Sequence, residues 1–151
     1  MYQRPESVLV VVYTVRGEVL LLRRCDPADF WQSVTGSLQW DETPAQAAAR
    51  ELAEETGMTA VVIEDCAQSH RYPILPAWRA RFDPAVRENL EHVFRVRVPA
   101  PCAVHLDARE HTAFRWMQRN EALRWVSSST NRTAILELPA PYNVATLPNE
   151  G

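Results

Sequence analysis

One helix with both of its ends marked constrains the fold of this chain most strongly. Thr43 is a good N-cap, Pro44 fits the first helical position, and Gln46 completes a Thr-x-x-Gln capping box. Residues 45–56 are mostly strong helix formers, and Gly57 stands where a helix needs a left-handed residue to end. The sequence therefore predicts a helix over 45–56 with two defined ends.

Short apolar segments on both sides of this helix predict β-strands. Residues 7–14 form a β-branched apolar run, which is typical of a central strand buried on both faces. The other segments predict strands at 19–23, 30–35, 59–65, 91–98 and 113–117, and short helices at 120–126 and 131–138. This order favours an α/β (α+β) fold in which helices pack against a mixed sheet.

Length and composition predict one globular domain over residues 1–151, with an irregular tail from about Pro139. The three cysteines are odd in number and widely spaced, which excludes a disulfide scaffold and a structural zinc site and fits a reducing compartment. The apolar run at 8–13 is too short to cross a membrane. We therefore expect a cytoplasmic protein that does not bind membranes.

The charge pattern argues against nucleic acid as a partner. All 16 basic residues are arginine, and the 19 acidic residues give a net charge of −3. Because no long run of either sign occurs, a basic face for non-specific nucleic-acid binding is not expected.

Three carboxylates share one face of the predicted helix. Glu51, Glu54 and Glu55 are spaced i, i+3 and i+4, so they lie within one turn of each other and repel. The ordinary explanation is a solvated helix face on which Arg50 pairs with Glu54. However, Glu42 and Asp41 precede the helix, and clustered carboxylates without cysteine or histidine suit the hard cations Mg²⁺ or Mn²⁺. A bound cation lets an acidic protein handle a polyphosphate.

These residues belong to a longer motif by which the chain resembles the Nudix hydrolases. The motif reads Gly36-x5-Glu42-x7-Arg50-Glu51-Leu52-x-Glu54-Glu55-x-Gly57-Met58. The resemblance implies an α/β/α sandwich with a mixed sheet, a loop–helix–loop that binds divalent metal, and hydrolysis of a nucleoside diphosphate linked to another group. It also implies that Glu51, Glu54 and Glu55 bind the metal, that Glu42 and Arg50 support them, and that Gly36 and Gly57 allow the turns.

Segments outside the motif resemble one Nudix subfamily, the bacterial dihydroneopterin triphosphate pyrophosphatases, which also accept dATP. These segments are Tyr2-x-Arg4-Pro5, Asp29 to Ser37, Pro44-x-x-Ala47-Ala48 and Asn131-Arg132-x-Ala134-Ile135. The resemblance implies Mg²⁺-dependent release of pyrophosphate from a small-molecule triphosphate, in folate biosynthesis. Alternatives are a general Nudix hydrolase of oxidised deoxynucleotides or dinucleoside polyphosphates, and a non-catalytic nucleotide-binding Nudix domain.

The same resemblance implies further site residues. Glu110 completes the metal site, although a glutamate before a strand is ordinarily a solvated loop residue. The implied substrate contacts are Arg23, Thr35, Tyr72, Pro73, Ile74, Leu75 and Ser128. The subfamily also has a basic residue at the position of Gln3, and the neighbouring Arg4 could take its place as a contact. Ordinary alternatives are a surface charge for Arg23 and a plain strand residue for Thr35. His111, next to Glu110, is more commonly a surface histidine, the alternative being contact with the active site.

The expected reaction is an in-line attack of a metal-bound water on phosphorus, which displaces pyrophosphate. Glu54 and Glu110 are the two candidates for the base that takes the proton from this water. Arg23 and Arg79 are candidates for binding the phosphates, since a guanidinium offers planar paired donors.

Overall fold

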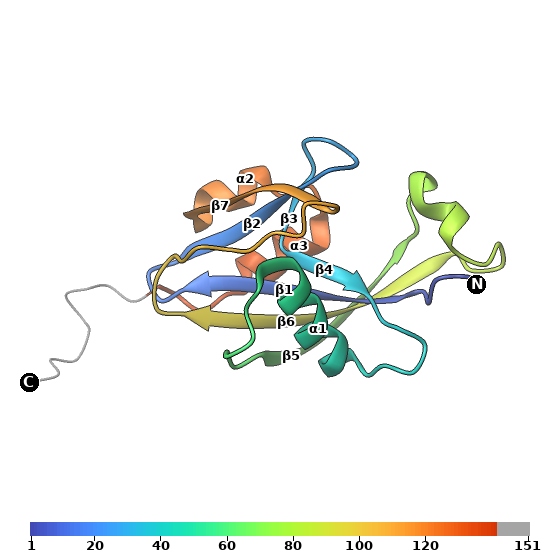
Figure 1. The fold of residues 1–151 in the computed structure, drawn as a ribbon, viewed down its shortest axis with the longest axis horizontal. Coiled ribbons are helices and arrows are strands. Elements are labelled where there is room, and N and C mark those ends of the chain that lie inside the picture. Colours follow the sequence, from blue (N-terminus) through green and yellow to red (C-terminus); the bar gives the residue numbers. More distant parts are fainter. Residues whose placement is uncertain (142–151) are drawn as a thin grey trace, which may run out of the picture.

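The computed structural model describes residues 1–141 (Figure 1). Its elements are β1 (Glu6–Thr14), β2 (Glu18–Arg24), β3 (Trp31–Gln32), β4 (Val34–Ser37), α1 (Pro44–Thr56), β5 (Glu64–Pro73), the 3-10 helix η1 (Pro76–Arg81), β6 (Glu88–Val98), β7 (His111–Gln118), α2 (Arg119–Trp125) and α3 (Ser129–Leu136). Residues 139–141 have no regular structure, and the remainder of the predicted tail lies outside the described residues.

The strands form one mixed seven-stranded sheet, as predicted. β1 pairs in parallel with β6, from Glu6 opposite Leu90 to Thr14 opposite Val98, and all other strand pairs are antiparallel. Eight of the nine residues of β1 are buried. The prediction of a central strand covered on both faces is therefore confirmed.

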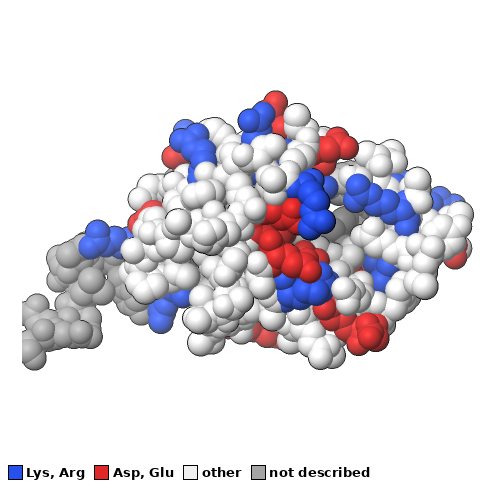
Figure 2. Space-filling model, in the orientation of Figure 1, with Lys and Arg blue, Asp and Glu red and all other residues white. Residues whose placement is uncertain are grey.

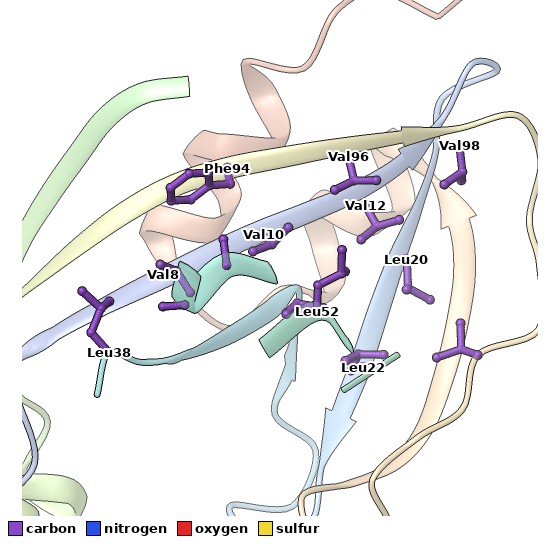
Figure 3. Packing of buried hydrophobic residues seen from close by; sticks show 14 residues of the cluster. Val8, Val10, Val12, Leu20, Leu22, Leu38, Leu52, Phe94, Val96 and Val98 are labelled. Carbon is purple, nitrogen blue, oxygen red and sulfur yellow. The ribbon is translucent and has the colours of Figure 1, made fainter. Parts of the chain in front are cut away.

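Helices cover both faces of the sheet, which gives the expected α/β/α sandwich. On one face, Leu52 of α1 packs among the valines of β1 and the leucines of β2 (Figure 3). On the other face, alternate residues of β1 such as Leu9 and Val11 pack against Ala134 and Ile135 of α3. The two-residue alternation of a strand therefore assigns each β1 side chain to one helical layer.

The capping pattern places α1 as predicted. The Thr43 hydroxyl accepts a hydrogen bond from the Gln46 amide nitrogen, and the Gln46 side chain accepts one from the Thr43 amide nitrogen. Gly57 adopts the left-handed conformation with φ of 80°, and its N–H donates to the Ala53 carbonyl. Both ends of the helix that carries the carboxylates are therefore fixed locally.

The prediction of one strand over 30–35 is wrong, because this segment divides at Ser33. β3 pairs with β2, whereas β4 pairs with β1. The buried Asn131 side chain holds the break: it accepts a bond from the Ser33 amide nitrogen at 2.8 Å and donates to the Ser33 hydroxyl at 2.9 Å. The sheet therefore forks between β3 and β4, next to the end of α1.

The prediction of a strand over 59–65 is also wrong. Residues 57–63 have no strand pairing, and β5 begins at Glu64 and extends to Pro73. Met58, Val61 and Ile63 pack against the core below α1 instead. A loop that packs against the core can be as apolar as a buried strand, so a short apolar run does not distinguish the two.

No helix within the described part of the chain is long and apolar enough to cross a membrane.

Candidate active site

Arg50 connects the acidic face of α1 to the loop that precedes it. Its guanidinium donates to both carboxylate oxygens of Glu42, at 2.7 and 2.8 Å, and to the Ser37 carbonyl at 3.0 Å. It also donates to Glu51 Oε1 at 2.7 Å and to Glu54 Oε2 at 3.2 Å. The half-buried guanidinium of Arg50 thus fixes the orientation of the carboxylates relative to the loop.

Arg4 holds the same loop from the opposite side. Its guanidinium donates to the carbonyls of Gln39, Trp40 and Glu42 and pairs with Glu6 at 2.8 Å. These bonds use both terminal nitrogens of the guanidinium that the resemblance implied as a substrate contact. The structure therefore gives Arg4 a role in shaping the loop.

Glu55 is fully buried at the fork of the sheet. Its Oε2 accepts a hydrogen bond from the Thr35 amide nitrogen at 3.0 Å, so this N–H of β4 binds the helix in place of a neighbouring strand. Its Oε1 lies 3.6 Å from His111 Nε2 and has no hydrogen-bond partner among the described residues. Ligand atoms of Glu55, Glu110 and His111 lie within 4.8 Å of one another.

The electrostatics of these carboxylates favour a bound cation. Burial raises the pKa of Glu51 to about 7 against the opposing hydrogen bond from Arg50, and repulsion from Glu54 and Glu110 adds to the rise. Burial likewise raises the pKa of Glu55 well above its usual value, with Glu51 and Glu110 contributing. A divalent cation among these oxygens would offset both the burial and the repulsion.

The residues that the sequence assigned to the metal are therefore brought together. Glu51, Glu55 and Glu110 interact, whereas the Glu54 side chain stands at the rim, 53% exposed and bonded to Arg50. Acidic side chains gather at the centre of one face, with basic ones on both sides and a hollow beside them (Figure 2). The donor set is mostly hard oxygen, which fits Mg²⁺ or Mn²⁺.

His111 does not lie at the surface, which corrects the prediction from sequence. It begins β7 opposite Arg24 of β2, and only 2% of it is exposed. Burial lowers its pKa to about 4, with the nearby Arg24 charge contributing, so the ring is neutral at pH 7. Pairing of β7 with β2 is what buries His111. The residues next to it in the sequence gave no signal of this burial.

Arg24, and not Arg23, faces the carboxylates. The Arg23 guanidinium pairs with Asp29 at 2.6 Å, whereas Arg24 interacts electrostatically with Glu55 and Glu110 and stacks over the Trp78 ring at 5.3 Å. Arg24 was not among the site residues predicted from the sequence. Strand alternation contained the signal, since Arg24 is in phase with Leu20 and Leu22, which pack on the α1 face.

The remaining predicted substrate positions lie at the end of β5, in the segment that leads to η1, and at the start of α3. Tyr72 is half-buried, and its hydroxyl accepts a bond from Asn89 at 3.0 Å. Ile74 is buried, whereas Pro73 and Leu75 are exposed. Ser128 is the N-cap of α3 and contacts the Thr130 hydroxyl at 3.0 Å.

Arg79 does not face the carboxylates with a free guanidinium. It donates to the carbonyls of Val86 and Pro84, and thereby closes the loop between η1 and β6. Trp31 packs edge-on against Trp125 in the core, with ring centroids 5.2 Å apart. Trp78, in contrast, stacks against Arg24, an arginine of the site.

Comparisons with known proteins agree with this geometry. The model of the NUDIX domain family matches residues 3–138. The dihydroneopterin triphosphate diphosphatase of Haemophilus influenzae is 37% identical over 139 residues, which cover 89% of this chain and 87% of that protein. The enzyme of the same name from Escherichia coli is 38% identical over 140 residues, which cover 89% of this chain and 92% of that protein.

The fold comparison gives the same family. The solved structure of the E. coli dihydroneopterin triphosphate pyrophosphohydrolase superposes with a TM-score of 0.85 at 36% identity, covering 91% of this chain and 97% of that one. An α/β/α sandwich with an acidic site at its fork is the architecture of a Nudix hydrolase, and the chain belongs to the Nudix family. It is an enzyme of that family, a pyrophosphohydrolase, and such hydrolases generally use a divalent metal.

Proposed function

We propose that this enzyme hydrolyses dihydroneopterin triphosphate to the monophosphate and pyrophosphate, using Mg²⁺. The observation that carries the proposal is the similarity to two curated dihydroneopterin triphosphate diphosphatases at 37% and 38% identity over nearly the full length. The complete acidic face of α1, including the buried Glu55, supports an active rather than a degenerate site.

Glu51, Glu55 and Glu110 are the residues that would hold the metal, with Glu54 at the rim. Bound Mg²⁺ supplies positive charge to the phosphate oxygens and lowers the pKa of coordinated water. Mg²⁺ is favoured because the site offers few carboxylates and leaves room for phosphate and water. Mn²⁺ is the expected substitute.

The chain's own groups bind and orient the triphosphate. Arg24 offers a guanidinium beside Glu55 and Glu110, and its stacking on Trp78 restricts its rotation. Glu110 and Glu54 are the candidates for accepting the proton of the attacking water, since both side chains stand at the open edge of the acidic cluster. Thr35 fixes Glu55 through its amide nitrogen.

A second candidate function is that of a general Nudix hydrolase of deoxynucleoside triphosphates such as dATP or an oxidised nucleotide. The metal site and the phosphate contacts serve both functions equally. The two functions differ in whether the enzyme recognises the pterin or the nucleotide base of the substrate. They therefore predict different ratios of kcat/KM between the two kinds of triphosphate.

The test is a comparison of kcat/KM for dihydroneopterin triphosphate, dATP, GTP and 8-oxo-dGTP with Mg²⁺, measured by pyrophosphate release. A preference for the pterin of about tenfold, or about 1.4 kcal/mol, supports the proposal. Equal or faster turnover of a nucleotide would favour the general hydrolase. A Glu51→Gln variant is the negative control.

We further propose a cytoplasmic location for this enzyme. The three cysteines are free in the structure, as suits a reducing compartment.

A further inference from the structure

His111 contacts the buried metal-binding carboxylate directly. Its Nε2 lies 3.6 Å from Glu55 Oε1, and the two side chains are 1% and 0% exposed. The same Nε2 lies 3.4 Å from the side-chain nitrogen of Gln32 on β3. Both groups are enclosed by the fork of the sheet, so bulk solvent does not reach this contact.

The hydrogen of the imidazole is best placed on Nε2. Glu55 Oε1 accepts hydrogen bonds only, and turning the Gln32 amide by 180° brings its oxygen to face the same ring nitrogen. A ring nitrogen that donates here carries its hydrogen in the neutral form and in the charged form alike. The direction of this N–H toward Glu55 therefore does not depend on how His111 titrates.

If this N–H closes the 3.6 Å separation to Oε1 when the metal site is filled, both oxygens of Glu55 are held from the protein side. Thr35 N–H donates to Oε2 at 3.0 Å, and His111 faces Oε1. Each carboxylate oxygen has a second lone pair, which remains free for a cation on the side of Glu110. A carboxylate oriented in advance binds a metal more tightly than one that must be ordered on binding.

We propose that His111 is a positioning residue, which orients Glu55 for metal binding through an Nε2–H bond and does not itself ligate the metal. The proposal rests on the metal-binding role proposed above for Glu55, and it adds to the motif a residue from β7 that no motif position includes. The position of Gln32 makes it the second partner of the ring.

The test measures Mn²⁺ binding in the absence of substrate, by the electron paramagnetic resonance signal of free Mn²⁺. His111→Leu is expected to raise the Kd for Mn²⁺ by about 10- to 100-fold, as loss of an outer partner of a ligand does. His111→Gln keeps an amide donor and should recover most of the affinity. An unchanged Kd in the leucine variant would overturn the proposal.

The matched control is His92→Gln. His92 also bonds a carboxylate, Glu6 Oε2 at 2.6 Å. Neither of these two residues belongs to the acidic cluster. It should leave the Kd for Mn²⁺ unchanged. Melting temperatures in EDTA show whether each variant is folded, and if the leucine variant is not, the glutamine variant is compared with wild type alone.

A spin-echo measurement on the Mn²⁺-loaded wild type decides between positioning and ligation. The proposal expects no nitrogen modulation from a directly bound imidazole. A strong nitrogen signal that disappears in His111→Gln would show ligation and overturn it. Because no substrate is present, these results are independent of whether the pterin is the true substrate.

Discussion

The carboxylate of Glu51 lies directly over Gly36. A Cβ atom built on Gly36 would lie 2.1 Å from Cδ of Glu51 and 2.2 Å from its Oε1. The Glu51 carboxylate can therefore occupy this position only while residue 36 has no side chain. The need for glycine at position 36 comes from this close contact. It does not come from the backbone, because Gly36 is not in the left-handed conformation.

Replacing Gly36 with alanine is expected to displace Glu51 and lower kcat/KM by about 100-fold, the cost of a misplacement near 1 Å. Steady-state kinetics with Mg²⁺ measures the effect. Gly17→Ala is the control, because φ at Gly17 is +90° in a turn far from the carboxylates. It should lower stability and leave kcat/KM close to wild type; equal kinetic losses in both variants would contradict the prediction.

Stabilisation by Mg²⁺ is expected to grow with pH. The pKa of Glu51 is raised to about 7 and that of Glu55 is raised well above its usual value, so the metal-free folded state binds more protons than the unfolded state. Stability of the metal-free protein therefore falls as pH rises through about 7. Mg²⁺ needs the ionised carboxylates and restores that loss.

Melting temperatures in EDTA and in saturating Mg²⁺, at about pH 6 and about pH 8, measure this effect. The increment due to Mg²⁺ should be larger at the higher pH. An increment that is the same at both pH values, or larger at the lower one, would show that these two carboxylates do not control metal binding.

Arg24→Ala is expected to lower kcat/KM by about 10- to 100-fold, the value of a lost charge-assisted hydrogen bond. Arg23→Ala should change it by less than about threefold, because that guanidinium pairs with the exposed Asp29 side chain. Kinetics of both variants with the same triphosphate measure the difference. The reverse order would restore the original assignment to Arg23.

Asn131→Ala is expected to lower the free energy of unfolding by about 1–3 kcal/mol, because it leaves the buried Ser33 amide unpaired. Urea denaturation measures the change. Asn120→Ala, at an exposed position of α2, is the matched control and should cost little. A similar small loss in both variants would mean that the fork between β3 and β4 is held by other contacts.

Glu91→Gln is expected to stabilise the protein by about 1 kcal/mol at about pH 8 and to have little effect at about pH 5. Glu91 is 4% exposed, and its Oε1 has no hydrogen-bond partner among the described residues. Burial raises its pKa, although the Thr130 hydroxyl and His70 act in the other direction. The stability due to the protonated form is therefore lost as pH rises.

Urea unfolding of wild type and variant at the two pH values tests this prediction. A difference that is independent of pH would contradict it. If kcat/KM falls while stability rises, the carboxylate is retained for substrate at a cost in stability.

The sequence determined those features that depend on neighbours along the chain. The ends of α1 follow from Thr43, Gln46 and Gly57, whose bonds all lie within one helical turn. The shared face of Glu51 and Glu55 follows from helical periodicity alone, and β1 was recognisable as buried from its unbroken apolar run.

Only the tertiary structure decided which side chains from separate elements meet at the fork. Strand pairing of β2 with β7 buries His111, and the change of partner at Ser33 opens the space that Glu55 enters. The choice of Arg24 over Arg23 depends on the face that each strand residue presents. Local spacing fixes a residue's position on its own element, whereas register and packing between distant elements fix its neighbours.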